Sequence, residues 1–383
     1  MDNLTHSLAG LAAAKAGLER LSPGTTALCI LAANAPDADV VVLLFSDRWA
    51  FLKYHRGITH SIVGTLVLAL LLPVIFHFLD RFIARLRGRQ PTTRLKGLLV
   101  ASVLVTATHP VMDWTNNYGV RLLLPWSSQW FYGDLVFIID PFIWLVLGGA
   151  GFLLTSRSKW QIGLWLLPTL VVTYLVLIVS PERGVTNAFL LRAVWIVGLT
   201  ALVISARLRV AERWEHRIAV AALALVVLYW GGLAFMHFLA LRETRLAAAA
   251  IASQNGESVI DLAAMPTLAN PFQWQSVVET ERAAYRFDLS LLRSQRDFSS
   301  MVRYERADAA GSKAVATASK DWRARIFLGF ARFPGLRVAD PDCVTQTLVQ
   351  FADLRYTEPG KSRGTFTLDV PVDCPNRSGE QAR

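Results

Sequence analysis

The sequence predicts a mainly α-helical protein: a polytopic helical membrane domain, residues 1–242, followed by a small extracytoplasmic α+β domain, residues 243–383. Hydrophobic residues make up 53% of the 383 residues, and the mean hydropathy of +0.38 is high for a soluble protein. Several apolar runs approach the roughly 20 residues that an α-helix needs to cross a bilayer. After about residue 245 these runs stop, and segments with the alternation of β-strands begin.

The apolar runs give the expected helices in chain order. The second run is interrupted at Asn34–Asp37, and such a break is tolerated in a membrane only where protein or water satisfies the freed backbone groups. Residues 275–280, 283–289 and 365–370 are expected to be strands, and residues 313–332 helical. The expected helices are residues 3–19, Thr25–Ala35, Val40–Phe45, Ile58–Leu79, Leu95–Val111, Leu135–Leu154, Ile162–Val179, Ala188–Ala206 and Ile218–Leu239.

The basic residues predict the orientation. They cluster between apolar runs at residues 81–96, 157–159 and 207–217, and short basic loops favour the cytoplasm. Strict alternation then places the His55/His60 end, the loop of residues 112–134 and everything after Arg242 outside. We therefore expect a multi-pass membrane protein with an extracytoplasmic C-terminal domain.

The net charge of +10 needs no nucleic acid to explain it, because the loop bias accounts for it and no nucleic-acid-binding motif accompanies the charge. The expected partner is the lipid bilayer.

Of the three cysteines, Cys29 lies in an apolar run and is expected to be inert. Cys343 and Cys374 lie in the polar C-terminal part and could form a disulfide if that part is extracytoplasmic.

Histidine and aspartate residues recur at the predicted outer ends of the spans. Ionisable residues are costly at membrane depth and mark functional sites. Imidazoles and carboxylates are ligands for a divalent metal, with zinc expected first and manganese or magnesium as alternatives. The candidate metal ligands are His6, Asp37, His55, His60, His109 and Asp113. Arg56 is a candidate to bind an anionic group, and Asp39, Asp134 or Asp140 could orient a ligand or act as a base.

The spacing within two motifs constrains this site. His109 and Asp113 are four residues apart and share a face if the helix is continuous. Pro110 instead allows a new helix to begin there, with His109 at its cap. His55 and His60 are five apart with Gly57 between them, which favours a turn leading into a helix.

Structural explanations stay open for single members of the set. A membrane histidine can simply form a hydrogen bond to a neighbouring helix. The carboxylates of Asp37, Asp113 or Asp134 could be helix caps, and Asp140-Pro141 could break a helix. For the whole protein, the leading hypothesis is a membrane-embedded metal-dependent hydrolase. The alternatives are a non-enzymatic membrane protein with a structural metal or polar cluster, and an ion transporter with a site at the broken helix.

Four segments resemble the YdjM-like family, described as LexA-regulated, inner-membrane-associated, metal-dependent hydrolases. The resemblance covers about residues 1–180 and implies metal-dependent hydrolysis. The order of histidines and aspartates is also similar to zinc phospholipase C and related nucleases, which implies a phosphoester substrate. With a site at the membrane, that substrate is expected to be a lipid or lipid-linked. The matching segments are Leu4–Gly10, Pro36–Asp39, His55–Ser61 and His109–Asp113.

Overall fold

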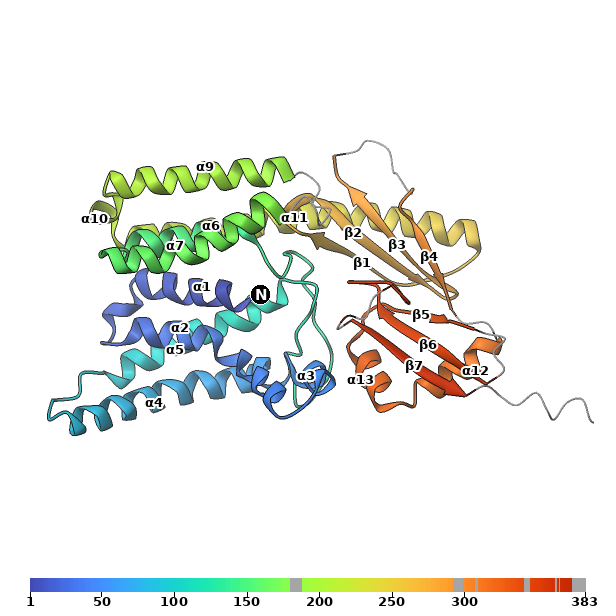
Figure 1. The fold of residues 1–383 in the computed structure, drawn as a ribbon, viewed down its shortest axis with the longest axis horizontal. Coiled ribbons are helices and arrows are strands. Elements are labelled where there is room, and N and C mark those ends of the chain that lie inside the picture. Colours follow the sequence, from blue (N-terminus) through green and yellow to red (C-terminus); the bar gives the residue numbers. More distant parts are fainter. Residues whose placement is uncertain are drawn as a thin grey trace, which may run out of the picture. The chain divides into compact units, whose positions relative to one another are not determined.

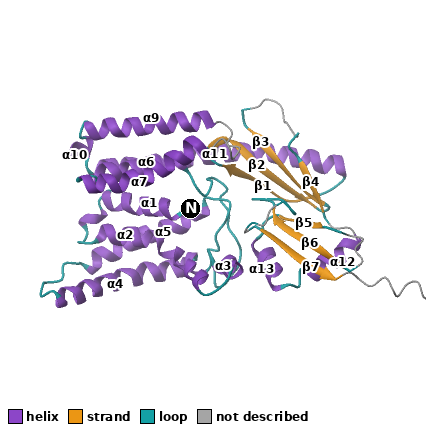
Figure 2. Cartoon of the chain, in the orientation of Figure 1, coloured by secondary structure: helices purple, strands orange, loops and turns teal. Residues whose placement is uncertain are grey.

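The computed structural model describes residues 1–179, 188–292, 299–306, 309–340, 345–361, 364 and 366–373. It confirms a mainly helical N-terminal part followed by an α+β region with two antiparallel sheets (Figures 1 and 2). Contacts divide the chain into two compact units. The first contains Met1–Asp39, Arg56–Met236 and Pro266–Pro271, and the second contains Val40–His55, His237–Met265 and Phe272–Arg383.

Among the described residues, six helical segments are long and apolar enough to cross a membrane. Many of their large apolar side chains are exposed, as expected for surfaces that face lipid. The six segments are Thr25–Leu44, Ile62–Leu86, Leu95–Trp114, Lys159–Ile178, Ala188–Arg207 and His216–Asn255. Their helices are α2 (Thr25–Asn34), α4 (Ile62–Leu86), α5 (Leu95–Trp114), α7 (Lys159–Tyr174), α9 (Ala188–Arg207) and α11 (His216–Asn255).

Shorter helices complete the first unit. α1 (Asn3–Lys15) packs against α2, α5 and α6 (Pro141–Thr155), and Figure 1 shows α1 and α2 side by side. Gly10 makes the α1–α2 approach close, because a Cβ there would lie 2.6 Å from the carbonyl oxygen of Cys29. The remaining short elements are η1 (Leu18–Arg20), η3 (Ile58–His60), η4 (Leu175–Val179) and α10 (Val210–Trp214).

The expected helix Leu135–Leu154 is wrong at its start, because α6 begins only at Pro141. The Asp140 carboxylate accepts hydrogen bonds from the backbone N–H groups of Phe142 and Ile143, and Pro141 occupies the first turn. A capping aspartate followed by proline is a strong helix start. The apolar composition of residues 135–139 therefore does not make them helical.

The interruption predicted at Asn34–Asp37 is present as a change of helix type. α2 ends at Asn34, and a 3₁₀ helix, η2 (Ala35–Leu44), continues the chain. In contrast, α5 passes through Pro110 without a break, so the alternative of a new helix capped by His109 is wrong. His109 and Asp113 therefore lie one turn apart on one face of α5.

The second unit contains two antiparallel sheets. The first has the order β1 (Val259–Thr267), β2 (Asn270–Thr280), β3 (Ala283–Ser290) and β4 (Val302–Glu305); the second has β5 (Pro334–Val338), β6 (Gln346–Asp353) and β7 (Thr367–Asp373). Trp274, Phe327 and Phe351 are fully buried in this unit. Its helices outside α11 are α3 (Arg48–Tyr54), α12 (Ala309–Ala318) and α13 (Trp322–Phe330).

Two predictions on the C-terminal part stay open. α11 is continuous through residue 242, and contacts divide it between the units after Met236, so the domain limits remain a prediction. Cys343 and Cys374 lie outside the described residues.

Candidate metal centre

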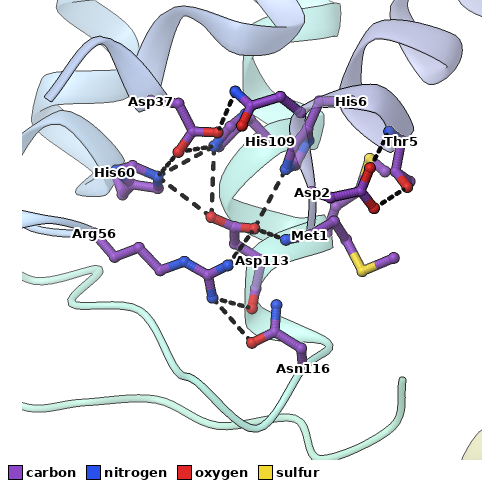
Figure 3. A network of polar contacts seen from close by, with 12 residues as sticks. Met1, Asp2, Thr5, His6, Asp37, Arg56, His60, His109, Asp113 and Asn116 are labelled. Carbon is purple, nitrogen blue, oxygen red and sulfur yellow. Dashed lines mark hydrogen bonds and ion pairs between the residues drawn. The ribbon is translucent and has the colours of Figure 1, made fainter. Parts of the chain in front are cut away.

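Four of the predicted ligands form one buried group. They are Asp37 from η2, His60 from η3, and His109 and Asp113 from α5, and each offers a ligand atom within 4.8 Å of the others. Figure 3 shows the four side chains pointing toward one another. His60, His109 and Asp113 are fully buried, and Asp37 is 8% exposed. We call these four residues the His/Asp cluster.

The two imidazoles present the same nitrogen to the centre of the cluster. The Nε2 atoms of His60 and His109 lie 3.1 Å apart. Asp113 Oδ2 lies 3.3 Å from Nε2 of His60 and 3.4 Å from Nε2 of His109. Asp37 Oδ1 lies 3.3 Å and 3.6 Å from the same two nitrogens. Two imidazole nitrogens and two carboxylate oxygens are a donor set that suits zinc and other first-row divalent metals.

The outer ring nitrogens have partners of their own. His109 Nδ1 lies 2.6 Å from the carbonyl oxygen of Ala33, and because a carbonyl oxygen only accepts, Nδ1 carries the proton of that hydrogen bond. His60 Nδ1 lies 3.4 Å from Asp39 Oδ2. Metal-binding histidines usually bond through their other nitrogen to a carbonyl or carboxylate in this way. Asp39 is therefore placed to orient His60.

The turn that carries His60 is set by local sequence. Ser61 caps α4, its hydroxyl oxygen accepting from the N–H of Gly64. A Cβ at Gly64 would lie only 1.8 Å from the carbonyl oxygen of Ile58, so a side chain there would displace η3. The predicted turn between His55 and His60, leading into a helix, is confirmed.

Arg56 reaches the cluster from the same turn. Its backbone φ is +52° and its side chain is buried. Nη2 lies 3.0 Å from Asp113 Oδ1, and Nη1 donates to Asn116 Oδ1 at 2.9 Å and to the carbonyl oxygens of Asp113 and Gly119. The guanidinium also lies 4.6 Å from the Tyr118 ring centroid. These contacts favour a role in holding Asp113, while the predicted binding of an anionic group stays a prediction.

Charge in the cluster favours a cation. Asp37, Asp39 and Asp113 are three buried carboxylates, and one of them, Asp113, ion-pairs with both Arg56 and the Met1 amino group. Buried carboxylates are stable where they are paired or coordinate a metal, so the residues present fit a divalent cation.

The other predicted site residues have different positions. His6 lies beside the cluster, stacked 3.8 Å from His109 between ring centroids, with Nε2 3.3 Å from Asp113 Oδ1. His55 ends α3 in the second unit and stacks on Phe51. Direct ligation by His6 or His55 stays a prediction.

The remaining carboxylates lie beyond the cluster. Asp134 is buried and follows Gly133, whose N–H donates to the carbonyl oxygen of Trp114 at the end of α5. Its predicted catalytic role stays a prediction. Asp140 caps α6 and accepts from the Tyr229 hydroxyl at 2.9 Å. These contacts favour a structural role for Asp140.

Two amides near the cluster, those of Asn3 and Asn116, were not among the predicted site residues. Asn3 donates from Nδ2 to Asp37 Oδ2 at 3.0 Å, and Asn116 accepts from Arg56. Asn3 lies one helical turn before His6, and Asn116 lies three residues after Asp113. A position three residues from a predicted ligand is the sequence signal that could have indicated these two amides.

The fold and the His/Asp cluster together define a multi-pass membrane protein with a buried site that can hold a metal ion. Residues 1–185 match the model of the family described as "YdjM inner membrane protein". The resemblance noted in the sequence is thereby confirmed for this part of the chain. The family description and the six candidate spans agree on a multi-pass protein of the inner membrane.

Two curated proteins are similar to this chain. "Uncharacterized protein YfhP" of Bacillus subtilis (strain 168) is 26% identical over 155 residues, 38% of this chain and 43% of that protein. "Inner membrane protein YbcI" of Escherichia coli (strain K12) is 34% identical over 116 residues, 30% of this chain and 61% of that protein. The matches therefore span less than two thirds of either relative. No solved structure matches the chain significantly.

Proposed function

We propose that this protein is a metal-dependent hydrolase that cleaves a phosphoester in a lipid or lipid-linked substrate at the outer face of the inner membrane. The observation that carries the proposal is the His/Asp cluster, with its four donors within 4.8 Å of one another. The basic loops support the outer face, because short loops rich in Lys and Arg favour the cytoplasm and this end of the spans is opposite to them.

Asp37, His60, His109 and Asp113 would hold the metal. A divalent metal in such a site lowers the pKa of a bound water and stabilises the charge that develops on a phosphoryl oxygen. The protein residues around it have separate tasks. Asp39 orients His60, the carbonyl of Ala33 fixes the tautomer of His109, and Arg56 holds Asp113. Asp134 is the carboxylate that we assign as the candidate base.

Chelation tests this function. The purified protein in mixed detergent–phospholipid micelles is expected to release phosphate or a phosphorylated headgroup from phospholipid or polyprenyl-phosphate substrates. EDTA should stop this turnover, and added zinc or manganese should restore it, because the cluster supplies the metal's ligands. Turnover that continues at full rate after the metal content has fallen to background would contradict the proposal.

A structural metal is the second candidate, favoured by the complete burial of His60, His109 and Asp113. The ligands come from three elements, η2, η3 and α5, so a metal would join segments distant in the sequence. In that case, chelation lowers the thermal unfolding temperature, and no phosphoester substrate is turned over in the metal-loaded protein.

A further inference from the structure

We propose that the groove between α1, α6, α7 and α9 binds an acyl chain of a membrane phospholipid. This goes beyond the His/Asp cluster, which lies on a different side of α1. One part of the proposal, that the polar end of this lipid lies beside the cluster, rests on the proposed function.

The groove is apolar and has a volume of about 240 Å³. Its walls include Leu4 and Leu8 of α1, Trp144 and Gly148 of α6, Trp165 of α7, and Leu202 of α9. α7 and α9 belong to candidate membrane spans. A cavity with this lining at membrane depth favours hydrocarbon, because apolar surfaces do not hold ordered water.

Glycines of α6 leave the space open. A Cβ at Gly148 would meet one atom within 4 Å, Leu8 Cδ1 at 3.7 Å, so this position borders empty space. A Cβ at the neighbouring Gly149 would instead lie 2.7 Å from Leu202, where α6 packs closely against α9. Gly149 therefore serves helix packing, whereas Gly148 widens the groove.

The occupant follows from what surrounds the groove. Leu166 of α7 and Val203 of α9 line it and are 53% and 58% exposed, on helices whose outer surfaces face lipid. The groove is thus continuous with the lipid-facing surface of the first unit. A phospholipid chain is the apolar group present there at high concentration, so we assign it as the occupant.

One end of the groove lies level with the His/Asp cluster. Leu4 is two residues from His6, a rise of roughly 3 Å along the helix axis. Trp144, in the groove wall, donates from Nε1 to the Thr5 hydroxyl at 2.8 Å. From Trp144 to Phe152, α6 extends the wall for about 12 Å. A chain in this groove can therefore place its headgroup at the depth of the cluster.

Photolabelling tests the inference. The full-length protein is placed in nanodiscs that contain a phospholipid with a diazirine in its acyl chain, irradiated, digested and analysed by mass spectrometry. Labelling of Trp144–Phe152 is compared with labelling of the exposed face of α4, which reports ordinary contact with bulk lipid. We expect the groove to be labelled more strongly than α4 and to keep its lipid through detergent washing.

Two variants fill the groove from different helices. Gly148→Leu should reduce groove labelling about ten-fold, since its side chain takes the place of about two methylene groups of the acyl chain. Val203→Trp should act in the same direction. Gly163→Leu is the matched control, because Gly163 of α7 is exposed and a Cβ there meets nothing within 4 Å.

The outcomes separate this inference from the proposed function. Groove labelling no stronger than that of α4, or unchanged in both filling variants, overturns the acyl-chain site. Metal content is measured on the same samples. A labelled groove in a protein without metal would support the acyl-chain site and contradict the proposed hydrolase. A metal-loaded protein with an unlabelled groove would contradict the acyl-chain site and leave the proposed hydrolase intact.

Discussion

Replacement of both His60 and His109 by alanine is expected to lower the metal content to background and to abolish turnover. The two Nε2 atoms lie 3.1 Å apart at the centre of the cluster, and the remaining carboxylates, Asp37 and Asp113, would lose both nitrogen donors. The loss should exceed the roughly 10–100-fold that removal of an outer partner of a metal ligand costs. Elemental analysis after metal-replete expression, together with turnover, measures both effects.

His77→Ala is the matched control for this pair. His77 lies on α4 and contacts the Thr93 hydroxyl at 2.7 Å, outside the His/Asp cluster. Its replacement should leave metal content and turnover at the wild-type level. A double variant that binds as much metal as His77→Ala would show that the His/Asp cluster is not the metal site.

Arg56→Ala is expected to destabilise the protein by about 3–5 kcal/mol, the usual cost of removing one partner from a buried ion pair. Asp113 is fully buried, and Arg56 contacts both its carboxylate and its carbonyl oxygen. Arg56→Lys keeps the charge but lacks the planar fork that also reaches Asn116, so we expect only partial recovery. A denaturant titration of each variant in detergent gives its free energy of unfolding.

Arg89→Ala provides the comparison at an exposed ion pair. Arg89 bonds to Asp80 at 2.6 Å, and its side chain is 40% exposed. Such pairs contribute about 0–1 kcal/mol. If Arg56→Ala lowers the free energy of unfolding no more than Arg89→Ala, then Arg56 does not hold Asp113, and its predicted contact with an anionic group becomes the better explanation.

The convergence of the His/Asp cluster could be predicted because His60, His109 and Asp113 fell at the predicted outer ends of apolar runs. Asp37 fell at the break in the second run. Their residue types narrowed the chemistry, since imidazoles and carboxylates at membrane depth need partners or a cation. The four-residue spacing of His109 and Asp113 gave a shared face, and only the effect of Pro110 was open. A proline within a membrane helix is tolerated where neighbours satisfy the freed carbonyl, which a local pattern does not reveal.

Other features depend on contacts between distant segments. The start of α6 at Pro141 is fixed by the Asp140 cap, which competes with an apolar run that looks helical by composition. Arg56 looks from its motif like an anion-binding residue, but its main partners are Asp113, Asn116 and the carbonyl of Gly119. Asn3 reaches Asp37 only because α1 packs against α2. Such partners become visible once the helices are placed together.

X-ray absorption spectroscopy tests the central claim most directly. The spectrum is recorded on the purified wild-type protein at the edge of the metal that elemental analysis finds. We expect a stoichiometric metal with imidazole scattering from two histidines and oxygen neighbours from Asp37 and Asp113, the four donors of the His/Asp cluster. A protein without bound metal after metal-replete expression, or a spectrum with sulfur neighbours and no imidazole scattering, would contradict the assignment of the His/Asp cluster as a metal site.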